Sequence, residues 1–118
     1  MIGRSEIFDY VKKKYDVTPD YPFEKYHHYA ALRHLDDEKW FGLVMNVPRD
    51  KLGLDGEGEV DILDVKCQPA KVDDLKKKTG FRPAYHMNKQ HWLTVLLDGT
   101  VPKQDILNLL DESYDLTK

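Results

Sequence analysis

The densest group of side chains that can contact a ligand lies between Pro83 and Trp92. This stretch of ten residues, Pro-Ala-Tyr-His-Met-Asn-Lys-Gln-His-Trp, combines aromatic, cationic, amide and imidazole groups. It runs into the alternating segment 91–97, and such alternation is typical of a strand with one buried face. A sheet would therefore hold the stretch in place. The candidate ligand contacts within it are Tyr85, His86, Asn88, His91 and Trp92.

Cationic side chains accompany this stretch. They are Lys76, Lys77, Lys78, Arg82 and Lys89. Long cationic side chains on one face contact phosphates, and aromatic rings such as Tyr85 and Trp92 stack on unpaired bases. In the alternative interpretation, the lysines keep a short helix soluble and Trp92 belongs to the core. The five cations thus predict a nucleic-acid surface, with an ordinary solvated face as the competing explanation.

Five histidines raise the question of a metal site. His86 and His91 can approach each other across a hairpin, and His27 and His28 are adjacent. A metal site needs three or four converging ligands, and no cysteine or carboxylate stands at ligand spacing from these histidines. We therefore expect no metal.

Catalytic chemistry is not indicated either. Cys67 lies on the inward side of an expected strand and should be a buried thiol. His86 with Asp98 or Tyr85 is the one acid–base pair to consider, and nothing in the sequence fixes their geometry. Residues 56–59 match neither a dinucleotide fingerprint nor a calcium loop. We expect neither enzymatic activity nor a cofactor.

Composition indicates one domain over residues 1–118. The chain is 41% hydrophobic and 33% charged, enough for a single core. Its formal net charge is -3, so any anion binding must rest on a local patch. A single cysteine fits a reducing compartment, and no apolar run is long enough for a signal peptide or a membrane span. We expect a cytoplasmic monomer rather than an oligomer or a membrane protein.

Periodicity predicts a helix and then a hairpin in the first half. Ile7, Val11 and Tyr15 recur every four residues, which predicts a helix over 5–15 with Ser5 as its N-cap. After a connector, residues 29–35 and 40–47 read as two strands joined by the acidic turn 36–39. Alternation in the second strand predicts that one of its faces is buried.

The connector itself, residues 16–25 and the tyrosines that follow, contains two prolines. Its aromatic residues are Tyr21, Phe23, Tyr26 and Tyr29. They can either plug the end of a core or form an exposed patch for a protein partner.

The second half repeats this alternation of strands and helices. Residues 60–67 predict a third strand, and a short helix containing Val72 and Leu75 follows, with Gly80 as its C-cap. An edge strand over 81–87, interrupted by Pro83, should pair with 91–97 as a hairpin. Pro102 then opens a last helix, whose buried stripe is Ile106, Leu109, Leu110 and Tyr114. The predicted fold class is α+β, a two-layer sandwich of an antiparallel sheet with helices on one face, in the order α-β-β-β-α-β-β-α.

The sequence also resembles a known family. The residues that carry the resemblance are Val65–Pro69, Ala84–Lys89, His91–Val95, Leu97–Pro102 and Ser113–Tyr114, with Trp40–Met45 upstream. They are similar to the MmcQ/YjbR family of small bacterial proteins, and the likeness is specific from Tyr85 to Pro102. The resemblance implies a secretion-chaperone-like two-layer fold and a DNA-binding role that uses two wings. Here the tip at Asn88 suits phosphate, whereas the acidic turn 36–38 would repel it.

We therefore expect a small binding domain, with DNA bound through the local cationic and aromatic surface as the first hypothesis. A protein or peptide partner is the second hypothesis. The third is a small polar ligand bound beside His86, which a concavity at that position would favour.

Overall fold

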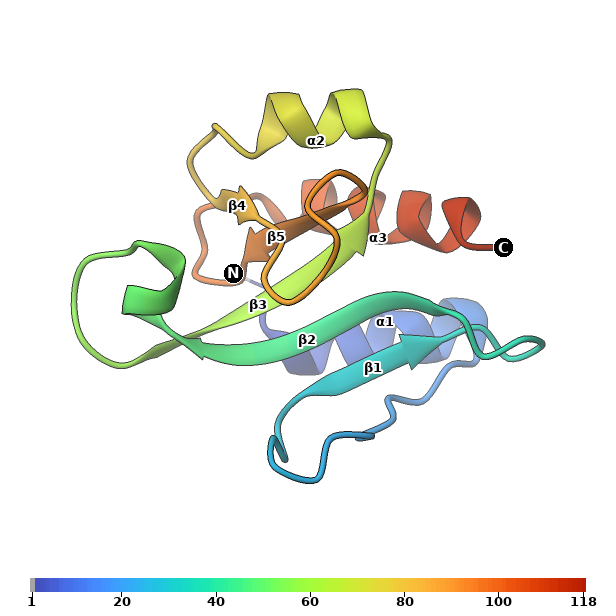
Figure 1. The fold of residues 1–118 in the computed structure, drawn as a ribbon. Coiled ribbons are helices and arrows are strands. Elements are labelled where there is room, and N and C mark those ends of the chain that lie inside the picture. The colour runs from blue at the N-terminus through green and yellow to red at the C-terminus, as the bar shows by residue number, and fades with distance from the viewer. Residues whose placement is uncertain (1) are drawn as a thin grey trace.

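The computed structural model describes residues 2–118, which form three α-helices, five strands and one turn of 3-10 helix, η1. In chain order the elements are α1 (Arg4–Tyr15), β1 (Ala30–Arg33), β2 (Trp40–Pro48), η1 (Arg49–Leu52), β3 (Glu59–Lys66), α2 (Pro69–Leu75), β4 (Phe81–Pro83), β5 (Trp92–Leu96) and α3 (Lys103–Leu116). The strands make one antiparallel sheet in the order β1-β2-β3-β5-β4 (Figure 1). The predicted α+β class and element order are confirmed.

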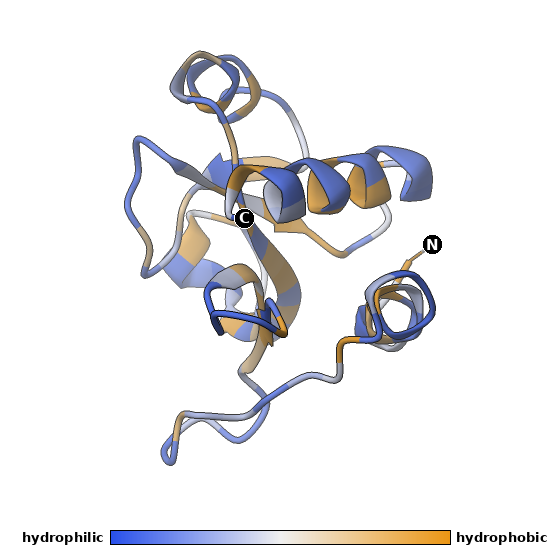
Figure 2. Ribbon diagram, turned by 90° about the vertical axis from the view of Figure 1, so that its right-hand side faces the viewer, coloured by the Kyte–Doolittle hydropathy of each residue, from blue (hydrophilic) through white to orange (hydrophobic). Residues whose placement is uncertain are grey.

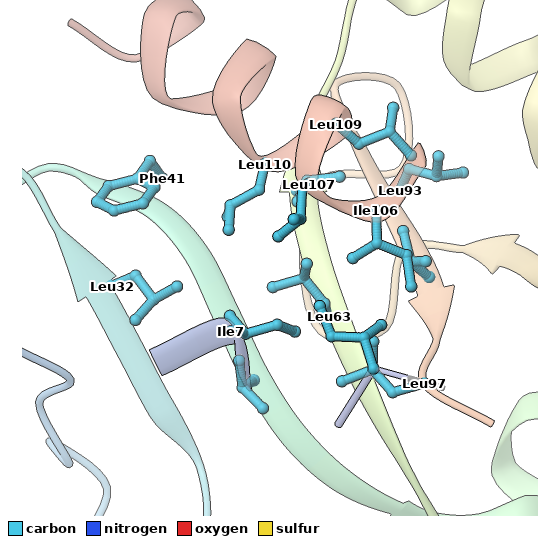
Figure 3. Packing of buried hydrophobic residues seen from close by; sticks show 14 of the residues in the cluster. Ile7, Leu32, Phe41, Leu63, Leu93, Leu97, Ile106, Leu107, Leu109 and Leu110 are labelled. Carbon is cyan, nitrogen blue, oxygen red and sulfur yellow. The ribbon is translucent and has the colours of Figure 1, made fainter. Parts of the chain in front are cut away.

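All three helices share one hydrophobic cluster with one face of the sheet. Ile7 of α1 and Ile106 and Leu110 of α3 pack with Leu63 of β3 (Figure 3), and Val72 of α2 belongs to the same cluster. Figure 2 shows α1 and α3 on the same side of the strands, and hydrophobic residues of both helices belong to this cluster. Within residues 2–118, no helix is both long and apolar enough to cross a lipid bilayer.

The opposite face of the sheet is also buried, which the sequence analysis did not predict. A second cluster there contains Tyr29, Ala31, Leu43, Met45, Val47, Leu52, Val60, Ile62 and Leu96. Its cover consists of two irregular segments, the connector (residues 16–29) and the 84–91 loop (residues 84–91), which contribute Phe23, Tyr85 and Met87. Figure 1 shows the 84–91 loop crossing the sheet on the side away from α1 and α3. Both faces of the central strands are therefore apolar.

A β-bulge at the start of β2 changes which face its residues occupy. Leu32 pairs with Gly42 and Arg33 pairs with Trp40, so Phe41 is an extra residue in β2. Phe41 consequently joins the helix-side cluster, while Leu43 joins the opposite one. Residues 41–47 therefore do not strictly alternate between the two faces of the sheet, because Phe41 lies on the opposite face from Leu43.

Two predicted helix caps are wrong. α1 begins at Arg4 with Gly3 as its N-cap, and Ser5 lies inside the first turn, so its hydroxyl makes no capping bond. α2 ends at Leu75 and its C-cap is Lys76. Gly80 has a φ of +95° in the turn before β4, so it shapes that turn rather than the helix end. β1 and β4 are shorter than predicted, since β4 ends at Pro83 and residues 84–87 belong to the following loop; Pro83 lies in an edge strand as expected.

Candidate ligand-binding groove

The 84–91 loop is folded around Asn88. The Asn88 side-chain oxygen accepts hydrogen bonds from the backbone N–H groups of Gln90 and His91, at 2.9 and 3.1 Å. The Asn88 backbone carbonyl accepts a third from Trp92 N–H at 3.0 Å. His86 has a φ of +63°, a left-handed conformation that reverses the chain direction. Asn88 is thus engaged in shaping the loop, and His86 stands at its turning point.

A buried polar chain ties this loop to the sheet. Tyr85 N–H donates to the Thr94 hydroxyl at 2.9 Å, and that hydroxyl donates to Asp64 Oδ1 at 2.5 Å. The Asp64 side chain is fully buried, and its Oδ2 has no hydrogen-bond partner. Burial raises the pKa of Asp64 to about 8, although the hydrogen bond from Thr94 and the charge of Lys89 act in the opposite direction. Asp64 is therefore largely protonated at neutral pH.

The connector forms the other side of the site. Backbone hydrogen bonds between Asp20 and Ala31 attach it to β1. Tyr26 stacks on Tyr29 with ring centroids 4.6 Å apart, and Tyr29 is buried against the sheet. Phe23 meets Tyr29 edge-on at 6.0 Å. Tyr29 therefore belongs to the core, as the first alternative predicted, whereas half of Tyr26 is exposed.

A groove lies between the connector and the 84–91 loop. We call it the His86 groove, and it has two compartments that share Tyr26, Tyr29 and His86. The polar compartment has a volume of about 380 Å³ and is also lined by Lys25, His27, His28, Asn46, Pro48, Lys51, Glu59 and Tyr85. The apolar compartment has a volume of about 360 Å³ and is also lined by Phe23, Trp40, Leu43, Met45 and Met87. These volumes are within the range of small-molecule sites, about 300–1,000 Å³.

Charge in the polar compartment is mainly positive. Among residues 2–118, neither Lys25 nor Lys51 has an acidic partner within ion-pair distance. The one acidic residue of the lining, Glu59, accepts a hydrogen bond from the Asn46 amide at 3.0 Å. Burial, together with the neighbouring Tyr85, Tyr26 and Glu59, raises the pKa of Tyr29 to about 12. Tyr29 thus keeps its proton at neutral pH and can donate a hydrogen bond.

The five predicted cations do not form one free surface. Lys76 pairs with Asp73 at 3.2 Å and Lys78 with Asp74 at 3.5 Å, in and just after α2. A spacing of three or four residues brings such side chains together on a helical turn. Lys77 is exposed.

Arg82 and Lys89 are engaged with backbone carbonyls. Arg82 Nε donates to Leu52 O at 3.0 Å and fastens η1 to β4. Lys89 Nζ donates to Ala84 O at 2.7 Å, across the base of the 84–91 loop. Both cations therefore hold local structure together.

The aromatic and imidazole candidates are divided between two places. Tyr85 and His86 line the His86 groove, and their rings lie 4.0 Å apart. Trp92 is 9% exposed and lies with Trp40 and Lys66 near the end of α3. His91 is exposed, and its carbonyl accepts from Cys67 N–H. Of the candidate ligand contacts, Tyr85 and His86 are thus the pair that reaches the groove.

Cys67 is a buried thiol, as predicted. Its side chain is 2% exposed in the helix-side cluster, and burial raises its pKa to about 11. A thiol in this state is a poor nucleophile.

Three residues that matter at the groove were not predicted from the sequence. Lys25 and Lys51 are far apart in the sequence and belong to no motif. Asp64 is a carboxylate between the apolar residues Leu63 and Val65, in the buried part of β3. Its position between apolar residues could have marked Asp64 in the sequence as a residue with a special role, because a charged residue is rarely fully buried without a partner.

Proteins similar to this chain are found in several bacteria. A family model described as YjbR matches residues 12–116. The chain is 51% identical over 118 residues to "Uncharacterized protein YyaQ" of Bacillus subtilis, covering 100% of both. It is 41% identical over 51 residues to "Uncharacterized protein YjbR" of Escherichia coli K12, which is 42% of this chain and 43% of that protein.

Two solved structures share the fold. The crystal structure of a Pseudomonas syringae protein matches with a TM-score of 0.96 and 47% identity, over 99% of this chain and 100% of that one. A Deinococcus radiodurans protein, described as carrying the family-model domain DUF419, matches with a TM-score of 0.67 and 27% identity, over 92% of this chain and 75% of that one. The family model covers nearly the whole chain, and its name is the one that the residues near Tyr85 had suggested. The chain belongs to the YjbR family.

Proposed function

We propose that this domain is a non-catalytic binding protein that holds a small organic molecule in the His86 groove. The observation that carries the proposal is the groove itself, two adjoining compartments of different polarity beside His86. Concave sites of this kind, mostly apolar with a few convergent polar groups, are the usual form of small-ligand sites. A cytoplasmic location, supported by a single buried cysteine, is part of the same proposal.

The groups in the groove are suited to binding. Tyr29 and Tyr85 offer hydroxyls, Asn46 offers an amide, and Lys25 and Lys51 offer ammonium groups. Because the pKa of Tyr29 is raised to about 12, that phenol remains a neutral hydrogen-bond donor and is no base at neutral pH. Such a set can orient a ligand through several hydrogen bonds.

A fragment screen monitored by amide chemical shifts tests this proposal. We expect bound fragments to shift the amides of residues 26–29 and 85–87 and to leave those of α1 unchanged. Tyr26→Ser should weaken binding about tenfold, because Tyr26 lines both compartments. Tyr21→Ser is the matched control: Tyr21 lies in the same connector and is equally exposed, 50% against 51%, yet lines neither compartment. If no fragment shifts the groove amides, or if both variants behave alike, the proposal is wrong.

DNA binding, the role implied by the family resemblance, is the second candidate. The exposed Lys77 supports it. The ion pairs of Lys76 and Lys78 and the carbonyl contacts of Arg82 and Lys89 reduce the charge available for phosphate. For this reason we place the small ligand first. A peptide in the apolar compartment is the third candidate, and titration with peptides in the same shift assay tests it.

A further inference from the structure

We infer that the ligand of the His86 groove is an amphipathic organic anion. Its flat apolar body would occupy the apolar compartment, and its acidic group would lie in the polar compartment near Lys25 and Lys51. This inference rests on the proposed function, because it names the chemical class of the ligand for that site.

The charge of the polar compartment favours an acidic group on the ligand. Lys25 and Lys51 line the polar compartment, and within residues 2–118 neither is neutralised by an ion pair. This differs from Lys76 and Lys78, each of which has its own aspartate. Glu59 is the one acidic residue of this lining, and its single negative charge stands against the two positive charges of Lys25 and Lys51. The compartment therefore retains an excess of positive charge, which favours an anion.

The aromatic and aliphatic lining of the apolar compartment favours a planar apolar group on the ligand. Leu43 and Met45 of β2 are buried and form its floor. Phe23 and Trp40 stand at one side, 5.8 Å apart and inclined by 69°. Met87 of the 84–91 loop also lines this compartment, and a thioether adapts to the edge of an aromatic ring. These walls suit a planar hydrocarbon or ring system.

Both ends must belong to one molecule because the compartments adjoin. Tyr26, Tyr29 and His86 line both of them. Tyr29 and Tyr85 interact at this junction through their side chains, and Tyr85 also lines the polar compartment, so this pair of phenols offers hydrogen-bonding groups to an anionic oxygen. A ligand with only an apolar body would leave the two lysines unused, and a small inorganic anion would leave the apolar walls exposed to water.

Two fluorescent probes with the same aromatic ring system separate the contribution of the acidic group to binding from the contribution of the apolar rings. One is 8-anilinonaphthalene-1-sulfonate, an anion, and the other is N-phenyl-1-naphthylamine, the same ring system without the sulfonate. Binding would be measured in a Trp92→Phe background, in which Trp40 is the one remaining tryptophan and donates excitation energy to a probe bound in the groove. The two variants to compare are Lys25→Gln/Lys51→Gln and Lys76→Gln/Lys77→Gln, which remove the same charge at different places.

We expect the anionic probe to bind at least tenfold more tightly than the neutral one. The Lys25→Gln/Lys51→Gln variant should abolish that difference, while the Lys76→Gln/Lys77→Gln variant should preserve it. If both probes bind equally well and the first variant changes neither, the anion inference is overturned and the groove proposal stands. If neither probe accepts energy from Trp40 and Tyr26→Ser changes nothing in the fragment screen, both proposals fall.

Discussion

Asp64 is an ionisable residue in an apolar, fully buried environment, which is unusual for a carboxyl group. It sits between Leu63 and Val65 in β3, fully buried, and one of its two oxygens has no hydrogen-bond partner. Its other oxygen accepts from Thr94, which in turn accepts from the Tyr85 amide. A single carboxyl group therefore supports the attachment of the 84–91 loop, which is one wall of the His86 groove.

The pKa of Asp64 predicts how stability depends on pH. Its pKa is about 8 in the folded protein, against an ordinary value near 3.8. Between these values the folded state binds more protons than the unfolded state, so this group makes stability fall as pH rises from about 4 to about 8. Asp64→Asn should remove most of that fall, on the order of a few kcal/mol. Urea unfolding at pH 5 and pH 8.5 measures it, and the idea fails if the variant and the wild type lose equal stability.

Residue chemistry was partly readable from the sequence. Cys67 was correctly predicted as a buried thiol from its position in a strand. The ion pairs of Lys76 and Lys78 could also have been predicted, because Asp73 and Asp74 precede them at helical spacing. The approach of Lys25 and Lys51 to one compartment could not, because it depends on where two irregular segments lie in the fold.

At the scale of elements, α3 is joined to the sheet at the β-bulge. Ser113 Oγ donates to the Phe41 carbonyl at 2.6 Å and accepts from Lys66 N–H at 2.8 Å. Phe41 is the bulged residue of β2, and Lys66 lies one residue beyond Val65, the last β3 residue paired with β2, so one hydroxyl satisfies a carbonyl and an amide at the end of that ladder. Ser113 thus connects β2, β3 and α3.

Removing this hydroxyl should destabilise the protein. Ser113→Ala leaves a buried carbonyl without its donor and an amide without its acceptor, which costs about 1–3 kcal/mol. Urea unfolding monitored by circular dichroism gives the free energy of unfolding. Ser5→Ala is the control, because Ser5 is exposed and makes no capping bond in α1. Equal losses in the two variants would show that the Ser113 contacts contribute nothing.

Helices and strands were predictable from the sequence where the apolar residues of one face recur with a helical or strand period. The α1 stripe of Ile7 and Val11 and the alternation in β5 located those elements to within about two residues, the usual error for element ends. The second buried face was missed because its cover, the connector and the 84–91 loop, has no period to read. The cap at Gly80 was wrong because a glycine with positive φ serves a turn as readily as a helix end.

At the scale of the whole molecule, the net charge of -3 limits any binding of DNA. We expect weak binding of labelled DNA at about 50 mM salt and its loss near 200 mM, because few free cations are available to release counterions. Lys76→Gln/Lys77→Gln/Lys78→Gln should abolish it, and Lys25→Gln/Lys51→Gln should not. Fluorescence anisotropy measures this, and an absence of binding at low salt would remove DNA from the candidates.

The two walls of the His86 groove have a consequence for the order of events during synthesis. One wall ends at Tyr29, and the other begins only at Ala84. The second wall is fastened through Thr94, and β5 must enter the sheet between β3 and β4 before it can close. Contacts so distant in the chain form late in folding. A nascent chain on the ribosome would therefore acquire this groove only after β5 has been made and has joined the sheet, and occupancy of the groove would distinguish molecules with β5 in place from those without it.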